Sequence, residues 1–171
     1  MKTKKILSST ILAIVLFTGF NSRAQNVVEV AVSSADHTTL VAAVKAGGIV
    51  ETLSGAGPFT VFAPTNTAFA KLPKGTVETL LEPANLTTLQ GILTYHVVAG
   101  NIDSKAVVAA ITAGKGKAVL KTVQGGVLTA SLKGKNVVIT DEKGGVATVT
   151  AVDLKGSNGV IHVIDTVLMH K

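Results

Sequence analysis

The side chains best suited to acid–base or nucleophilic chemistry are four histidines, His37, His96, His162 and His170. A nucleophilic hydrolase needs such an imidazole within reach of a serine or cysteine on a strained turn. The chain has no cysteine, and none of its serines stands in a Gly-x-Ser-x-Gly sequence. His96 or His162 with Asp165 would supply two members of a catalytic triad, so an uncharacterised hydrolase is kept as the least supported function.

The polar residues form no recognisable metal or cofactor motif. No two histidines are spaced to lie on one face of a helix, and Asp141-Glu142 offers too few oxygens for a calcium loop. The glycines and lysines at 114–117 lack the spacing of a phosphate-binding loop. With five Phe, one Tyr and no Trp, the chain has few rings on which bases could stack. We therefore predict no catalytic residue, no metal, no cofactor and no nucleic-acid partner.

The segment that organises the rest of the chain runs from Gly57 to Phe69. Residues 59–63 follow the period-two pattern of a short strand, and Pro64 ends the pairing because it has no backbone N–H donor. Thr65 and Asn66 follow as candidate N-caps, since their side-chain oxygens can accept from the free amides of a first helical turn. The sequence predicts a buried strand that leads directly into a helix.

Apolar residues at three- and four-residue spacing predict further helices before residue 112. Residues 26–35 are compatible with a helix or with an extended arm, and both interpretations are kept. Asn85 and Ser104 are expected to cap the helices that follow them. The predicted helices cover residues 36–46, 49–53, 66–72, 76–81, 86–96 and 104–111.

From residue 118 the pattern changes to short runs rich in β-branched residues, separated by turns that contain glycine. The runs cover residues 119–123, 127–132, 136–140, 146–152 and 160–164, and residues 167–169 are expected to complete them. This pattern predicts an antiparallel meander. Helices in the first part of the chain packed on strands in the second make an α+β domain.

Three segments resemble the signatures of the fasciclin-like domain family. Thr60–Phe69 is similar to the first signature, Tyr95–Val98 to the central Tyr-His motif and Asn158–Leu168 to the C-terminal signature. They occur in the family's order. The resemblance implies one fasciclin-like domain over residues 25–171, a β-wedge or sandwich of short, largely antiparallel strands with several short helices packed against it.

Residues 1–24 have the organisation of a secretory signal peptide. Three lysines precede an apolar run at 11–20, and small residues precede a cleavage position after Ala24. The apolar run is short for a membrane span of about 20 residues, and no second apolar span follows it. We expect a secreted protein, periplasmic or extracellular, with no integral membrane segment in the mature chain.

The charge of the mature chain argues against nucleic acid or an anionic membrane as a partner. The full sequence has 16 basic and 10 acidic residues, a formal net charge of +6. Four of the basic residues lie in the signal peptide, which leaves 12 against 10 and a net charge of +2. The remaining lysines are scattered over turns, so neither nucleic acid nor an anionic membrane is expected as a partner.

A contact surface is predicted at the polar residues of the signatures. The Tyr-His segment of some animal relatives is implicated in integrin binding, so the resemblance implies a first choice at Tyr95, His96, Val97 and Val98. The turn formed by Pro64, Thr65 and Asn66 is the second choice. The residue type itself favours another role for His96, as a partly buried imidazole that bonds backbone carbonyls and ties the end of its helix to the sheet.

Two functions fit these observations. The first is a secreted, non-enzymatic cell-adhesion or matrix-interaction module. It would act by surface recognition of an unidentified cell-surface or matrix protein or polysaccharide, with weak self-association to raise avidity. The alternative is a soluble carrier whose helix and sheet layers enclose a pocket for a small apolar ligand.

Overall fold

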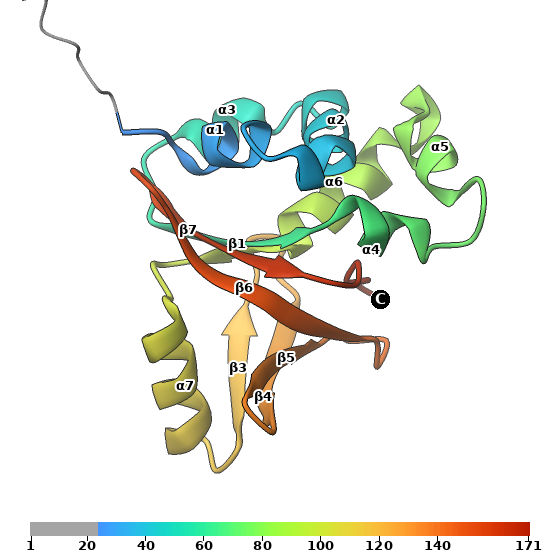
Figure 1. Ribbon diagram of the computed structural model, residues 1–171. Coiled ribbons are helices and arrows are strands. Elements are labelled where there is room, and N and C mark those ends of the chain that lie inside the picture. Colours follow the sequence, from blue (N-terminus) through green and yellow to red (C-terminus); the bar gives the residue numbers. More distant parts are fainter. Residues whose placement is uncertain (1–23) are drawn as a thin grey trace, which may run out of the picture.

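The structure is a computed structural model and describes residues 24–171 (Figure 1). The predicted signal peptide therefore lies outside the described residues, apart from Ala24. The described chain is mainly helical up to residue 113 and forms strands after it. The helices are α1 (Val27–Val32), α2 (Thr38–Ala46), α3 (Val50–Ser54), α4 (Asn66–Ala70), α5 (Thr76–Leu81), α6 (Leu86–Tyr95) and α7 (Ser104–Ala113), with the 3-10 helices η1 (Ala35–His37) and η2 (Pro83–Asn85).

Seven strands of the described chain form one sheet, in the order β2-β1-β7-β6-β5-β4-β3. They are β1 (Phe59–Pro64), β2 (Val97–Ala99), β3 (Lys117–Lys121), β4 (Val127–Lys133), β5 (Asn136–Thr140), β6 (Val146–Gly156) and β7 (Gly159–Ile164). Neighbouring strands are antiparallel except β1 and β7, which run parallel. The α+β class and the meander from β3 to β7 are confirmed. The prediction of a strand at residues 167–169 is wrong, since β7 is the last strand of the sheet. The position beside β7 that such a strand could occupy is taken by β1.

Two hydrophobic cores lie on opposite faces of β1 and β7, because neighbouring residues of a strand point to opposite faces. Ala63 and Ile161 belong to the helical core, which α1, α2, α3 and α6 complete. Phe62 and Ile164 belong to the second core, which α7 and strands β3 to β6 complete. Figure 1 shows the resulting wedge, with the helical layer above the long strands and α7 with β3 to β5 below them. The central pair of strands therefore joins the two layers.

The segment at 26–35, left open by its sequence, contains helix α1. Asn26 caps it, since its side chain accepts a hydrogen bond from the Glu29 amide at 2.9 Å and the Glu29 carboxylate accepts one from the Asn26 amide at 2.8 Å. This reciprocal pair satisfies two amides near the helix start. The Asn158 side chain accepts from the Val27 amide at 3.0 Å and so holds α1 against the end of the sheet.

Of the four predicted helix caps, only Thr65 is confirmed, since its side chain accepts from an amide of the first turn of α4 at 3.2 Å. Asn66 is the first residue of α4 and bonds outside it, Asn85 makes no side-chain capping bond with α6, and α7 is capped by Asp103 instead of Ser104. Each misassigned side chain has a partner in another element, which the local sequence does not reveal.

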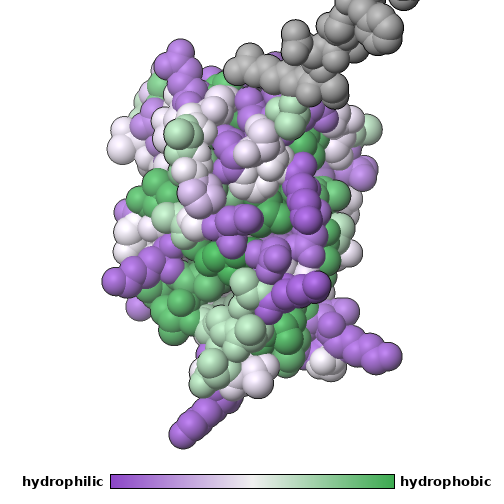
Figure 2. Space-filling model, turned by 90° about the vertical axis from the view of Figure 1, so that its left-hand side faces the viewer, coloured by the Kyte–Doolittle hydropathy of each residue, from purple (hydrophilic) through white to green (hydrophobic). Residues whose placement is uncertain are grey.

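Several large apolar side chains lie on the outside of the domain. Val108 on α7 and Val152 and Leu154 on β6 are each 39–44% exposed. Figure 2 looks onto the side of the molecule that carries α7 and shows apolar side chains gathered across the middle of this face, with hydrophilic ones around them. Exposed apolar groups in such numbers are typical of contact surfaces.

Gly159 in β7 leaves no space for a side chain beside the backbone of Phe59 in β1. A Cβ atom added to Gly159 would lie 2.0 Å from the Phe59 carbonyl oxygen, so the backbone would have to move. We expect Gly159→Ala to lower the free energy of unfolding by about 2–3 kcal/mol, because the parallel pairing must open at this point. Urea unfolding, followed by circular dichroism, measures the change.

A matched control is available in β2, which pairs with the other edge of β1 at Phe59. Ala99 pairs with Phe59 from β2 and is exposed, so Ala99→Ser adds one heavy atom without crowding the strand. Its stability is expected to stay within about 0.5 kcal/mol of wild type. Equal stability of the two variants would contradict the importance assigned to the Gly159 contact.

Candidate functional site

The four residues predicted as the first-choice contact surface, Tyr95 to Val98, are buried where α6 passes into β2. Their exposed fractions lie between 0 and 3%. Tyr95 and Val98 belong to the core below the sheet, and Val97 belongs to the helical core. The folded domain does not offer these side chains to a partner, so the predicted surface is corrected here. The family resemblance at this segment reflects packing.

The Tyr95 hydroxyl joins two strand ends. It donates a hydrogen bond to the Val127 carbonyl at 2.8 Å and accepts one from the Glu142 amide at 3.1 Å. Removal of the phenol from water raises its pKa, because burial disfavours the phenolate. Tyr95 therefore holds the turns that precede β4 and follow β5.

His96 connects the end of α6 to the C-terminal segment. Its Nε2 accepts a hydrogen bond from the Leu168 amide at 3.0 Å, so the proton of the neutral ring lies on Nδ1 and is donated to the Ile92 carbonyl at 2.8 Å. Complete burial lowers the pKa of His96 to about 4, because a charged imidazolium loses its hydration there. These bonds agree with a structural role for His96, although the ring is fully buried and only one of its two partners is a carbonyl. The hydrogen bond to Leu168 connects the end of α6 to the segment that follows β7, and not to the sheet.

The second-choice surface, the turn after β1, is partly accessible. Pro64 is buried, Thr65 and Asn66 are half-buried and Thr67 is exposed. The Asn66 side chain accepts from the Thr39 amide at 3.0 Å, at the first turn of α2. It also donates to a carbonyl of η1 at 3.0 Å. The exposed part of this turn is therefore held by Asn66 in a fixed position.

The hydrolase alternative finds no assembled triad among the described residues. The Nε2 atom of His162 lies 2.8 Å from the Ile102 carbonyl oxygen, so both nitrogen atoms of this ring face backbone groups. Asp165 accepts from the Thr148 amide at 2.8 Å and forms an ion pair with Lys71 at 3.5 Å, and neither partner is an imidazole. These side chains support the backbone of the fold.

Asp153 and Ser104 form a hydrogen-bonded pair between β6 and α7. The Ser104 hydroxyl and amide both donate to the Asp153 carboxylate, and the hydroxyl bond lowers the pKa of Asp153. This carboxylate therefore binds the first residue of α7 to β6. Over residues 24–171, no group of three or more His, Cys, Asp or Glu side chains is arranged to hold a metal ion.

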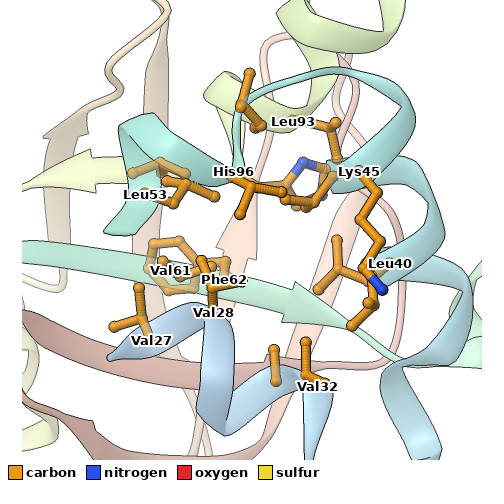
Figure 3. A pocket seen from close by; sticks show the side chains of 16 residues that line it. Val27, Val28, Val32, Leu40, Lys45, Leu53, Val61, Phe62, Leu93 and His96 are labelled. Carbon is orange, nitrogen blue, oxygen red and sulfur yellow. The ribbon is translucent and has the colours of Figure 1, made fainter. Parts of the chain in front are cut away.

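A pocket of about 280 Å³ lies in the helical layer, between α1 on one side and α2, α3 and β1 on the others (Figure 3). Its walls are aliphatic apart from Phe62, Lys45 and His96. The volume is close to the lower end of the range for small-molecule sites, about 300 Å³. The lining residues are Val27, Val28, Ala31, Val32, Leu40, Val41, Val44, Lys45, Ile49, Val50, Leu53, Val61, Phe62, Leu93, His96 and Val97.

The sequence contained one signal for this pocket that was not used. Residues Val27, Val28, Ala31 and Val32 recur at the spacing of one helix face. Only Val27 among them is fully buried, so α1 presents an apolar face that neighbouring helices do not fill. The pocket itself depends on how three short helices are spaced above β1, and the linear sequence does not specify that spacing.

His37 is the one buried polar side chain, among the described residues, with an atom that lacks a hydrogen-bond partner. Its Nδ1 lies 2.8 Å from the Ser34 hydroxyl, and its Nε2 has no partner. Burial lowers the pKa of His37, although nearby Asp36 opposes the shift. The ring lies outside the pocket lining, and like His96 it is held in the neutral form.

Comparison with known proteins agrees with the fold. A family model described as the Fasciclin domain matches residues 35–170. Protein sll1483 from Synechocystis sp. is 49% identical over 146 residues, which cover 85% of this chain and 74% of that protein. The cell surface glycolipoprotein MPB83 from Mycobacterium bovis is 37% identical over 124 residues, which cover 71% of this chain and 47% of that protein.

A solved structure shares the fold at greater distance. It is the FAS1 domain pair of the insect cell adhesion molecule Fasciclin I, with a TM-score of 0.58 and 21% sequence identity. The match covers 76% of this chain and 43% of that chain. The arrangement of short helices on a mixed sheet is therefore the FAS1 fold.

Replacement of His96 by alanine removes both of its hydrogen bonds and leaves the Leu168 amide without a partner. We expect His96→Ala to lower the free energy of unfolding by about 1–3 kcal/mol and the melting temperature by several degrees. Thermal unfolding at pH 7 measures the change. An unchanged melting temperature would contradict the structural role of this ring.

The lowered pKa of His96 also predicts acid sensitivity. The unfolded chain binds a proton near pH 6.5, whereas the folded chain does so only near pH 4. Stability is therefore complete above pH 6.5 and falls as the pH drops toward 4, by about 2 kcal/mol between pH 7 and pH 5. Urea unfolding at both pH values should show a smaller loss for His96→Ala than for wild type. An equal loss would assign the sensitivity to other groups, His37 included.

Proposed function

Because the chain belongs to the fasciclin domain family, we propose that it is a secreted, non-enzymatic module that recognises a protein or polysaccharide at its surface. The observation that carries this proposal is family membership over residues 35–170. The fold is shared with a cell adhesion molecule, and a relative is described as a cell surface protein. Among the polar residues of the signatures, His96 and His162 are buried inside the fold, which leaves recognition to accessible ones such as Thr67.

Export is part of the same proposal. Residues 1–24 would act as the signal peptide, with cleavage near Ala24, and the domain over 25–171 would work in the periplasm or outside the cell. In the part of the chain that the structure describes, no helix is both long enough and apolar enough to cross a membrane. The partner would be a cell-surface or matrix protein or a polysaccharide.

The contact surface that we propose is the turn after β1. Thr65, Asn66 and the exposed Thr67 follow directly on the end of β1. The bonds that Asn66 makes to η1 and α2 fix this turn before any partner arrives, which reduces the ordering cost of binding. Weak self-association through the exposed apolar side chains of α7 and β6 would add avidity.

Cell attachment tests this proposal. Producing cells are allowed to settle on a surface coated with the purified mature protein, and soluble protein is added as competitor. We expect saturable attachment that Thr67→Arg reduces at least severalfold, because a long charged side chain blocks the turn without entering the core. The number of cells retained after washing is the measurement.

The matched control is Thr79→Arg, at an exposed threonine of α5 outside the proposed contact turn. It is expected to attach cells as well as wild type does. Equal loss in both variants would point to a nonspecific effect of charge. Attachment that soluble protein does not compete would reject the adhesion function.

The pocket favours a second candidate function, a soluble carrier of a small apolar ligand. Its aliphatic lining excludes most polar ligands, since a polar group buried there would lack hydrogen-bond partners. The half-buried residues of α1 form one wall, so a modest movement of this short helix would admit a ligand. The carrier function and the adhesion function use different parts of the molecule.

The carrier function predicts binding of the neutral apolar dye 1-aminonaphthalene, whose ten carbon atoms suit the pocket volume, with a change in its fluorescence. Ala31 lines the pocket from α1, and Ala31→Phe should abolish this change because the ring fills the pocket. Ala106→Phe, at an exposed position of α7, is the matched control and should bind the dye normally. Thermal unfolding verifies that both variants are folded. Failure of the wild-type protein to bind the dye would reject the carrier function.

A further inference from the structure

The pocket carries one formal charge that the structure leaves without an ion pair. Lys45 lies in the last turn of α2, lines the pocket and is exposed. Among residues 24–171, the one ion pair joins Lys71 to Asp165, so the Lys45 ammonium has no carboxylate partner there. No acidic side chain lines the pocket. A bound molecule would therefore meet a single positive charge on an apolar wall.

The position of this charge marks one side of the pocket. Figure 3 shows the Lys45 side chain running along the pocket edge, on the side toward Val32, while Val27 and Leu53 lie on the opposite side. Val27 is buried and its amide is held by Asn158, whereas Val32 is 51% exposed. The anchored start of α1 thus closes one end of the pocket. Its free end lies on the side that carries the charge.

The volume limits the size of the apolar part of a ligand. An apolar cavity of roughly 150 Å³ holds benzene, which has six carbon atoms. The pocket of about 280 Å³ is nearly twice as large and therefore matches about 11 carbon atoms. One unbranched alkyl chain of medium length satisfies this limit. A lipid with two long chains exceeds it.

From these observations we propose that the pocket binds a single-chain amphiphile with an anionic head group, such as a medium-chain fatty acid. The alkyl chain lies among the valines and leucines of α1, α2 and α3, and the head group pairs with the Lys45 ammonium at the solvent edge. This inference rests on the carrier function proposed above and adds the chemical class of its ligand. A carboxylate and a phosphate head share the required charge.

Competition binding with four ligands of equal chain length tests the proposal. Dodecanoate, dodecyl phosphate, dodecanol and dodecyltrimethylammonium, each below the concentration at which it aggregates, are titrated against 1-aminonaphthalene bound to the mature protein. We expect wild type to bind the two anions more tightly than the alcohol, and the cation most weakly. The ratio between dodecanoate and dodecyl phosphate shows which head group is preferred.

Substitution of Lys45 separates the contribution of the head group to binding from that of the alkyl chain. Lys45→Met keeps the aliphatic part of the side chain and removes the charge, so it should weaken dodecanoate binding about fivefold, the effect of a partly exposed ion pair. Dodecanol and dye binding should stay unchanged. Lys74→Met, at an exposed lysine outside the pocket lining, is the matched control and should bind dodecanoate like wild type.

The outcomes distinguish the two levels of the proposal. Unchanged dodecanoate binding by Lys45→Met, with normal dye binding, overturns the anionic head group and leaves the carrier function standing. Absence of dye and dodecanol binding in wild type overturns both. A native mass spectrum of the secreted protein adds a direct measurement: a bound amphiphile supports the proposal, and a dimer whose formation blocks the dye assigns the pocket to a second copy.

Discussion

The parallel pairing of β1 with β7 is the contact on which the rest of the domain depends. It joins residues 59–64 to residues 159–164, and both strands are covered on each face by a different hydrophobic core. At Gly159 the pairing leaves no room for a Cβ atom beside the Phe59 carbonyl oxygen. The helical layer packs on one face of this pair of strands. On the other side of β7, strands β6, β5, β4 and β3 are added in turn. The pocket also borders β1, since Val61 and Phe62 line it.

The elements that depend on a few consecutive residues were predicted from the sequence. The contacts between residues far apart in the sequence were not. The strand at 59–63, the short helices and the β-branched runs follow from periodicity, because each is decided by a few consecutive residues. The parallel partner of β1 lies about 100 residues away and has no local signal. Asn66 looked like a cap for the same reason, since the η1 and α2 groups that it bonds are about 30 residues earlier. The pocket depends on the spacing between helices and was equally invisible.

The expected contact surface failed for a reason that the sequence did contain. Tyr95 ends the helix α6, and Val97 and Val98 form the short apolar strand β2 directly after it. A run of apolar residues of this kind normally indicates burial. The resemblance directed attention to their functional role in relatives, whereas the pattern favoured packing. Polar side chains such as His96, His162 and Asp153 then serve as connectors between backbone segments, which buried polar groups must do to retain hydrogen bonds.

The separation of β1 from β7 also has a consequence for the order in which the chain becomes structured. Contacts between residues so far apart form slowly, because the entropy cost of closing a long loop comes before any free energy is gained from the pairing. During synthesis the N-terminal half emerges without the strand that covers β1, and the helical core lacks Ile161 until the last residues are made. The central parallel pairing can therefore form only after residues 159–164 have been made. Such a delay would suit the export that we propose for this chain.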